Sequence, residues 1–368
     1  MKLNKLIDLK LIVSLLGILI FSLLSLYSAL HTQGEFSGRN IFLRQIIWLG
    51  LGGVVLGIFY LLDYYILYEL SIPLYLLSLL FLIAVEVLGR IRMGAQRWIE
   101  IFGVTFQPSE LAKLAAVLLL ARFFSGYLKI PYHNRRHDFW EGVVKPFLPL
   151  GILAFFIFTQ PDLGTTLVIV FLFIFMVFTL SRSRKNALII ISFIILLMPL
   201  GWKLLKPYQK QRLMVFLNPY QDPLGAGYTM IQSKIAVGSG RLWGKGFLAG
   251  TQNQLNFIPA RHTDFIFTVV AEEWGFAGCL LLLFLYYVFL RRILAIAFMT
   301  KDEFGCAVSL GIFALFLFHI FVNIAMVLGV LPVVGIPLPF LSYGGSFTLV
   351  SFSLLGIALN VYRKSNYF

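Results

Sequence analysis

The sequence predicts an all-α, polytopic membrane protein with about ten transmembrane helices, and three observations support this fold class. The 368-residue chain is 60% hydrophobic and only 12% charged, with a mean hydropathy of +0.89. This composition offers too little polar surface for a water-soluble globular protein. Its apolar runs match the roughly 20 residues that a helix needs to cross about 30 Å of hydrocarbon. Helices are expected throughout because lipid provides no hydrogen-bond partner for an open backbone.

The first predicted span covers residues 11–30 and follows a basic start. A basic start is typical of a signal peptide, but this apolar run is longer and further spans follow, so we predict an uncleaved helix. The chain is therefore expected to form one integral membrane domain over residues 1–368. The remaining predicted spans cover residues 45–62, 66–88, 108–125, 146–160, 164–181, 187–206, 265–290, 307–330 and 342–362,.

The basic residues predict the orientation of the chain. An even number of spans places both termini on one side, and the Lys and Arg residues of the short loops gather on that side. The opposite short connections, 160–163 and 331–341, contain neither residue type. By the positive-inside rule, both termini are expected to be cytoplasmic. The net charge of +14 is thus explained by topology rather than by nucleic-acid binding.

One connection, residues 207–264, is far longer than a helical hairpin needs. Loops of this length are usually functional or disordered, and this one is aromatic and apolar enough to pack against the bundle. It is expected on the extracytoplasmic side, between the seventh and eighth helices. Its basic residues outnumber its one acid before Asp264, which is Asp222, and predict an anionic ligand: Lys210, Arg212, Lys234, Arg241, Lys245 and Arg261.

Glu110 and Lys113 stand at the beginning of the fourth span. An ionised group near the membrane centre costs roughly 2.5–3.5 kcal/mol, so one that is present is a candidate for function. The i, i+3 spacing predicts an ion pair that lets both side chains lie below the membrane surface. Ser109, Glu110 and Asp162 also fit helix capping beside a proline, and capping and function are equally favoured there.

Asp264 precedes the eighth span and could cap that helix,. Arg261 and His262 adjoin it, however, and the basic loop comes before it, which a simple cap does not require. We therefore predict a site around Asp264, with Arg97, Lys113 and Asp162 on the same side of the membrane. The two glutamates of the eighth span, Glu272 and Glu273, are expected to be structural, with a partner inside the bundle.

His319 and Asn323 share one face of the ninth span because they are four residues apart. Interhelical hydrogen bonding is favoured for them over a ligand-binding role. The sequence contains no Walker, nucleophile-elbow, dinucleotide or zinc motif,. From the residues alone, an enzyme and a transporter of an anionic substrate fit equally well.

Six motifs together resemble the shape, elongation, division and sporulation (SEDS) family. They are GAQRWI (94–99), QPSE (107–110), QPDLGT (160–165), DPLGAGY (222–228), RHTDFIF (261–267) and PLPFLSYGGS (337–346). Within the family, the GAQRW motif, Gly244-Lys245-Gly246-Phe247 and the Arg before His-Thr-Asp resemble the rod-shape members more than the division members. Ala260 stands where the family pattern has Glu, which makes the mouth of the site more basic.

The resemblance implies a peptidoglycan glycosyltransferase that polymerises lipid II, the undecaprenyl-pyrophosphate-linked disaccharide peptide, at the outer face of the bacterial cytoplasmic membrane. It implies a class B penicillin-binding protein (a transpeptidase) and other elongation-complex proteins as partners. A lipid II flippase and a non-catalytic scaffold for the transpeptidase are the alternatives.

The family's essential aspartate falls on Asp264, which we predict to be the general base of an inverting displacement. Cations in a poorly hydrated pocket would stabilise the pyrophosphate that leaves, and a divalent cation such as Mg²⁺ or Mn²⁺ is left open as a cofactor. The residues predicted to bind substrate are Arg97, Glu110, Lys113, Asp162, Arg212, Lys234, Lys245, Arg261 and His262.

Overall fold

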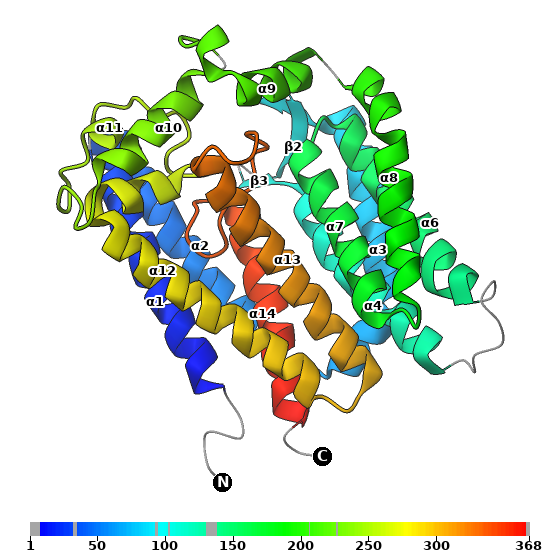
Figure 1. Cartoon of the computed structure of the whole chain (residues 1–368). Coiled ribbons are helices and arrows are strands. Elements are labelled where there is room, and N and C mark those ends of the chain that lie inside the picture. Colours follow the sequence, from blue (N-terminus) through cyan, green and yellow to red (C-terminus); the bar gives the residue numbers. More distant parts are fainter. Residues whose placement is uncertain are drawn as a thin grey trace.

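The computed structural model describes residues 8–31, 35–92, 95–101, 104–129, 138–205, 207–225 and 227–365. Within them, long helices run side by side in one bundle, and the start of α1 and the end of α14 lie at the same end of it (Figure 1). A five-residue π-helical turn, Trp140–Val144, leads into α6. The helices are α1 (Leu9–Leu30), α2 (Glu35–Leu61), α3 (Tyr64–Leu88), α4 (Pro108–Lys129), α6 (Lys145–Thr159), α7 (Leu163–Leu180), α8 (Arg184–Leu204), α12 (Ile266–Met299), α13 (Glu303–Val327) and α14 (Gly345–Ser365).

In the described part of the chain, nine of these helical segments are long and apolar enough to cross a membrane. They correspond to nine of the predicted spans. The predicted seventh span corresponds to α8, a 21-residue helix several of whose side chains lie outside the described residues. The polytopic all-α fold is thus confirmed, and a helix occupies each of the predicted positions.

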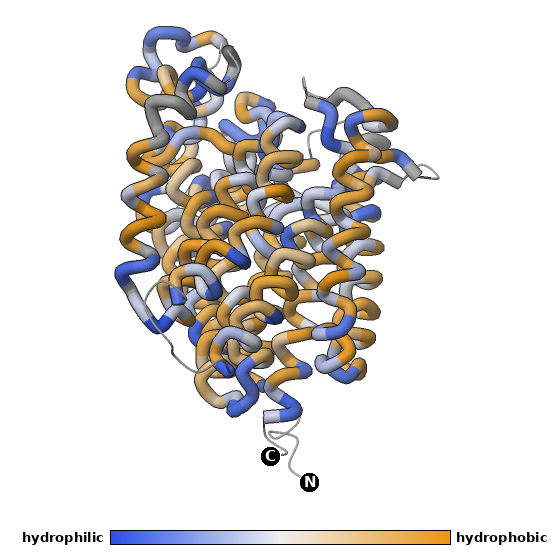
Figure 2. Tube along the Cα trace, turned by 90° about the vertical axis from the view of Figure 1, so that its right-hand side faces the viewer, coloured by the Kyte–Doolittle hydropathy of each residue, from blue (hydrophilic) through white to orange (hydrophobic). Residues whose placement is uncertain are grey.

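The centre of the bundle is formed by α4, α13 and α14, whose apolar stretches are mostly buried. In contrast, α2 and α3 expose most of their apolar side chains, as helices that face lipid do,. Figure 2 shows apolar residues along the length of the helices and hydrophilic residues near the two ends. The hydrophilic residues are therefore concentrated near the two ends of the bundle, and the helices between them are mainly apolar.

A small antiparallel sheet joins α3 to α4, and the sequence reasoning did not predict it. Its strands are β1 (Arg90–Arg92), β2 (Ala95–Ile101) and β3 (Val104–Phe106), in the order β1-β2-β3. Ile99 of β2 pairs with Phe106 of β3. Arg97 therefore lies on the central strand, whereas Gly94 of the same motif is outside the described residues.

The long connection before Asp264 packs over the end of the bundle that is opposite the start of α1 and the end of α14 (Figure 1). The hydroxyl of Ser233 donates to the carbonyl of Val327 at 2.7 Å, which ties this segment to the end of α13. Its helices are α9 (Pro207–Leu217), the 3₁₀ turn Pro219–Gln221, α10 (Tyr228–Ser239) and α11 (Thr251–Gln254).

Helix α12 is interrupted at Gly275, which has φ 64° and ψ −160°. The loop after α10 supplies hydrogen bonds at this break: Lys245 N donates to the carbonyl of Glu272 at 3.0 Å, and Phe276 N donates to that of Arg241 at 2.8 Å. Gly244, with φ +81°, permits the close approach, because a Cβ atom there would lie 2.1 Å from the carbonyl oxygen of Glu273,. The large connection is thereby anchored to α12 through the backbone.

The segment 331–344, between α13 and α14, has no regular structure, and several of its carbonyl groups are bound by side chains of the bundle. Tyr286 donates to Pro339 O at 2.7 Å, and Ser22 donates to Leu341 O at 2.9 Å. An irregular backbone is tolerated at membrane depth only when protein groups satisfy it. These side chains therefore allow a non-helical segment to enter the bundle.

Candidate functional site

Asp264 lies immediately before α12, at the end of the bundle that the long connection covers. The capping residue of α12 is Phe265, and no side chain caps this helix end. The capping alternative for Asp264 is therefore wrong. Within the described residues, no hydrogen bond or close ion pair reaches its carboxylate, so the group is available for another partner.

Burial raises the pKa of Asp264 from 3.8 to about 6, and the nearby carboxylate of Asp162 acts in the same direction. The guanidinium groups of Arg212 and Arg97 oppose this change because they favour the charged form,. A carboxylate with a pKa of about 6 is ionised at neutral pH and yet is more basic than an ordinary aspartate. This property suits a general base.

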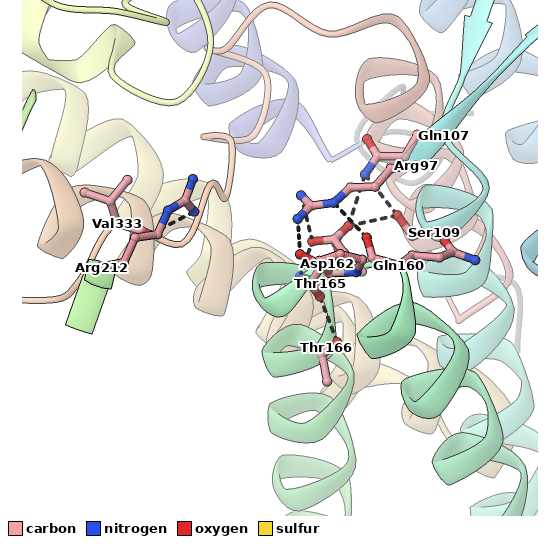
Figure 3. A network of polar contacts seen from close by, with 10 residues as sticks. Arg97, Gln107, Ser109, Gln160, Asp162, Thr165, Thr166, Arg212 and Val333 are labelled. Carbon is pink, nitrogen blue, oxygen red and sulfur yellow. Dashed lines mark hydrogen bonds and ion pairs between the residues drawn. The ribbon is translucent and has the colours of Figure 1, made fainter. Parts of the chain in front are cut away.

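Asp162 caps α7, as the sequence allowed. Its carboxylate accepts hydrogen bonds from the backbone N–H of Thr165 at 3.2 Å and from the Thr165 hydroxyl at 2.9 Å. It also accepts from Gln107 Nε2 at 3.2 Å and from the Ser109 hydroxyl at 3.3 Å (Figure 3). The structure thus adds a second role to the cap, because Asp162 joins the start of α4 to the start of α7.

Arg97 extends from β2 to this cluster. Its Nη1 atom lies 3.7 Å from Asp162 Oδ1, and its Nε donates to the carbonyl of Gln160 at 3.1 Å. It also donates to the carbonyl of Pro161. Three acceptors therefore orient the guanidinium, which is an example of the fixed geometry that arginine provides.

Arg212 reaches the same region from α9 and donates to the carbonyl of Val333 at 3.3 Å. Figure 3 shows the guanidinium groups of Arg97 and Arg212 turned toward one another from opposite sides. A pocket lies between them, so two fixed cations face one space near Asp264. It is lined by Arg97, Pro161, Leu163, Gln209, Arg212, Leu213, Pro332, Val333 and Val334.

Lys113 and Glu110 form the predicted ion pair, with 2.9 Å between Nζ and Oε2, and both side chains are buried. Lys113 Nζ also lies 3.2 Å from His319 Nε2 and over the ring of Phe347. This arrangement confirms the predicted pair and the predicted interhelical role of His319. Neither charged group lines the pocket.

The remaining predicted cations are engaged elsewhere. The buried guanidinium of Arg261 donates from Nε to Ala29 O at 2.7 Å. Lys245 binds the carboxylate of Glu272 at 2.7 Å. The exposed side chain of Lys234 lies against Gly329, which follows α13. None of the three lines the pocket, so their roles in substrate binding stay predictions.

His262 lies partly buried beside Asp264, and its Nδ1 atom is enclosed without a hydrogen-bond partner in the described part of the chain. Burial and the adjacent Arg261 lower the pKa of His262. Both effects favour the neutral form of the imidazole, and the role of His262 in substrate binding stays a prediction.

Glu272 and Glu273 have the structural roles that the sequence predicted. The carboxylate of Glu272 accepts from Asn253 Nδ2 at 2.6 Å and from Gln252 N at 2.9 Å, in addition to Lys245. Glu273 accepts a hydrogen bond from Ser28 of α1. These contacts fix α11 and α1 against α12 and leave both glutamates buried.

Sequence reasoning missed the contribution of the 331–344 segment to the pocket. Val333 and its neighbours are apolar, and a main-chain carbonyl that binds Arg212 leaves no sequence signal. It also missed Gln107 as a partner of Asp162, although Gln107 belongs to the QPSE motif that was singled out. The motif indicated the place but not the contact.

The described residues contain no group of three or more His, Cys, Asp and Glu side chains that could hold a metal ion. Asp162 and Asp264 are close enough for their charges to interact. Mg²⁺ is commonly held by one or two carboxylates together with phosphate oxygens of a substrate. The carboxylate of Asp162 is already occupied by Thr165, Gln107 and Ser109, so the described residues form no ready-made metal site, and the divalent cation stays a prediction.

The fold and the site define a polytopic helical membrane protein. An aspartate with a raised pKa and two guanidinium groups lie near one another at one end of its bundle. The chain belongs to the FtsW/RodA/SpoVE family, described as cell cycle proteins, whose profile matches residues 5–367. This result confirms the resemblance seen in the six motifs.

Individual relatives cover nearly the whole chain. The peptidoglycan glycosyltransferase MrdB of Escherichia coli is 40% identical over 360 residues, which cover 97% of this chain and 93% of MrdB. Stage V sporulation protein E of Bacillus subtilis is 36% identical over 366 residues and 98% of each chain.

Solved structures also resemble this chain over nearly its whole length. A chain from a peptidoglycan synthase complex that coordinates polymerization and crosslinking matches with a TM-score of 0.82 and 33% identity over 98% of each chain. The rod shape determining protein RodA of Thermus thermophilus matches with a TM-score of 0.72 and 29% identity over 97% of each chain.

Proposed function

We propose that this chain is a peptidoglycan glycosyltransferase that polymerises lipid II, with Asp264 as the general base. The names of the relatives support the reaction class. The observation that carries the assignment of the base is the position of Asp264. Its carboxylate is unpaired among the described residues, has a pKa of about 6, and is near two fixed guanidinium groups.

The chemistry is a single displacement between two lipid II molecules. The 4-hydroxyl oxygen of the acceptor GlcNAc attacks C1 of the donor MurNAc, and the bond from C1 to the pyrophosphate oxygen breaks. Undecaprenyl pyrophosphate leaves with the electron pair, and Asp264 takes the proton of the hydroxyl. This route inverts the anomeric centre from α to β and needs no covalent intermediate.

Arg97 and Arg212 are assigned to the leaving pyrophosphate. Negative charge develops on it during the reaction, and prepositioned cations lower the barrier most when they need no rearrangement. The acceptors around Arg97 and the carbonyl that binds Arg212 keep both groups in place. Lys113, which the sequence predicted in the same role, is paired with Glu110 and does not line the pocket, so its part in substrate binding stays a prediction.

The site is assigned to the outer face of the bacterial cytoplasmic membrane. It lies at the bundle end opposite the start of α1 and the end of α14 (Figure 1), and the positive-inside rule predicts that the termini are cytoplasmic. A class B penicillin-binding protein and other elongation-complex proteins are the proposed partners. The likeness to a chain of a synthase complex that coordinates polymerization and crosslinking supports this assignment.

The test is polymer formation from labelled lipid II by the purified chain with its class B partner, read on gels that resolve glycan strands. We expect glycan strands from the wild type and none from Asp264→Asn. Glu69→Gln, which changes an exposed carboxylate of α3, controls for effects of expression and purification. Equal polymer from both would remove Asp264 from the mechanism. A competent complex that makes no polymer, but moves lipid II across vesicles or only activates the transpeptidase, would establish the flippase or the scaffold instead.

A further inference from the structure

The turn that carries Asp264 is held by three consecutive carbonyl groups. The backbone N–H of Tyr343 donates to His262 O at 3.0 Å. The hydroxyl of Ser342 donates to Thr263 O at 2.7 Å, and Asn323 Nδ2 donates to Asp264 O at 2.8 Å. All three donors belong to α13 or to the segment that follows it, so the position of Asp264 depends on groups far away in sequence.

Asn323 has a further contact that makes it distinct from the other donors. Its Nδ2 atom also donates to Ile336 O at 2.7 Å, and its side chain is fully buried. Its Oδ1 atom has no hydrogen-bond partner among the described residues. The amide therefore acts only as a donor, and it joins the Asp264 turn to the 331–344 segment.

The same segment forms one wall of the pocket. Pro332, Val333 and Val334 line it, and Val333 O binds Arg212. Asn323 donates to the carbonyls of both Ile336 and Asp264. It therefore fixes the distance between the base and the pocket wall to which Arg212 donates a hydrogen bond. A misplacement of about 1 Å can cost about a hundredfold in rate.

We propose that Asn323 is a positioning residue that sets Asp264 against the pocket, and that Ser342 assists it through Thr263. This inference rests on the proposed function, because it names what places the base. It predicts a defect in turnover rather than in substrate affinity, since neither side chain lines the pocket.

Asn360 provides a matched control. It is also fully buried, its Nδ2 also donates to two backbone carbonyls, those of Phe59 and Leu62, and its Oδ1 is likewise without a partner in the described chain. It lies on α14 and contacts the end of α2. A purely structural effect of losing such an amide should therefore be the same at both positions.

The experiment compares Asn323→Leu with Asn360→Leu in the full-length chain bound to its transpeptidase partner. We expect Asn323→Leu to lower kcat for lipid II polymerisation about tenfold to a hundredfold and to leave KM within about twofold. The acid limb of its pH profile, near 6 in the wild type, should move to lower pH as Asp264 shifts toward water,. Asn360→Leu should change kcat, KM and the limb by less than about twofold.

Equal losses of kcat in the two variants, with unchanged pH profiles, would overturn the inference. If Asn323→Leu does not accumulate in folded form, Ser342→Ala replaces it: kcat should fall, and Ser342→Thr, which keeps the hydroxyl, should restore it. A Ser342→Ala variant with wild-type kcat would refute the proposal.

A second readout is independent of the reaction. Hydrogen exchange of the amides in residues 262–268 should be faster in Asn323→Leu than in the wild type and unchanged in Asn360→Leu. If the wild type makes no polymer, the proposed function fails, and the exchange result alone decides whether Asn323 holds the turn. Equal exchange in the two variants would show that it does not.

Discussion

The ammonium of Lys113 lies 2.9 Å from the carboxylate of Glu110, and both of these side chains of α4 are buried. Removing one partner of a buried pair leaves an uncompensated charge and typically costs about 3–5 kcal/mol. We therefore expect Lys113→Met to lower the thermal stability of the detergent-purified chain strongly. The double variant Glu110→Gln with Lys113→Met should recover much of this loss because no buried charge remains.

The pair Lys145 and Glu141 serves as the comparison. It has the same 2.9 Å separation, but Lys145 is half exposed. Pairs of this kind contribute about 1 kcal/mol or less, so Lys145→Met should change the unfolding temperature little. Similar losses from Lys113→Met and Lys145→Met would contradict the assignment of Lys113 to a desolvated structural pair.

A second prediction concerns how the burial of Asp264 changes the free energy of unfolding with pH. Its pKa is about 6 in the folded chain against 3.8 ordinarily, so the folded state binds the proton more tightly than the unfolded state does. Stability should fall as pH rises from about 4 to about 6, by at most roughly 3 kcal/mol. Asp264→Asn should remove this loss.

The measurement is thermal unfolding of wild type and Asp264→Asn between pH 4 and pH 8. The variant should be more stable than the wild type at pH 8, and the difference should vanish near pH 4. A variant that is less stable at pH 8 would mean that Asp264 is not desolvated. In the polymerisation assay, the same pKa predicts that the wild-type rate rises as pH increases through about 6.

Much of the fold could be predicted because its physical causes are local. Apolar runs long enough to cross the hydrocarbon located the helices, and the spacing of Glu110 and Lys113 was enough to predict their ion pair. The cap formed by Asp162 also follows from neighbours in sequence. The β1 to β3 sheet escaped prediction because three short strands in a polar connection give little periodic signal,.

The selection of cations at the site could not be predicted. Nothing local distinguishes Arg212, which lines the pocket, from Arg261, which binds Ala29, or from Lys245, which binds Glu272. Each choice depends on a partner that is far away in the sequence. Basic composition predicted an anionic ligand for the loop, but only the tertiary contacts show which side chains remain directed at the pocket.

Arg212 gives a sharper test of the leaving-group assignment than Arg97 does, because Arg97 also binds Asp162 and two carbonyls. Loss of one prepositioned donor in a catalytic site typically costs about 10²–10³ in kcat. We expect Arg212→Gln to show a loss of this order for lipid II polymerisation. Its acid limb should move above pH 6, because Arg212 lowers the pKa of Asp264.

Lys234→Gln is the comparison for this experiment, because the sequence predicted Lys234 to bind substrate but the structure leaves this exposed cation of the same connection outside the pocket. It should retain nearly all activity and the wild-type pH profile. If Arg212→Gln and Lys234→Gln lose activity equally, general attraction of an anionic substrate explains the basic loop better than a fixed pyrophosphate contact does.

The last prediction concerns the anchoring of the large connection at the break in α12. Gly244 has φ +81°, and a Cβ there would lie 2.1 Å from Glu273 O, where Gly246 N now donates at 3.0 Å. Gly244→Ala must therefore combine backbone strain with a displaced hydrogen bond. We expect it to destabilise the chain by about 3 kcal/mol or more.

Gly238 in α10 is the matched control, because no atom lies within 4 Å of the position that a Cβ would take there. Gly238→Ala should instead stabilise that helix by about 0.5–1 kcal/mol, since alanine loses less backbone entropy on folding than glycine does. Thermal unfolding of both variants in detergent, followed by tryptophan fluorescence, gives the comparison. A Gly244→Ala protein as stable as the wild type would show that the connection is not fixed to α12 through this contact.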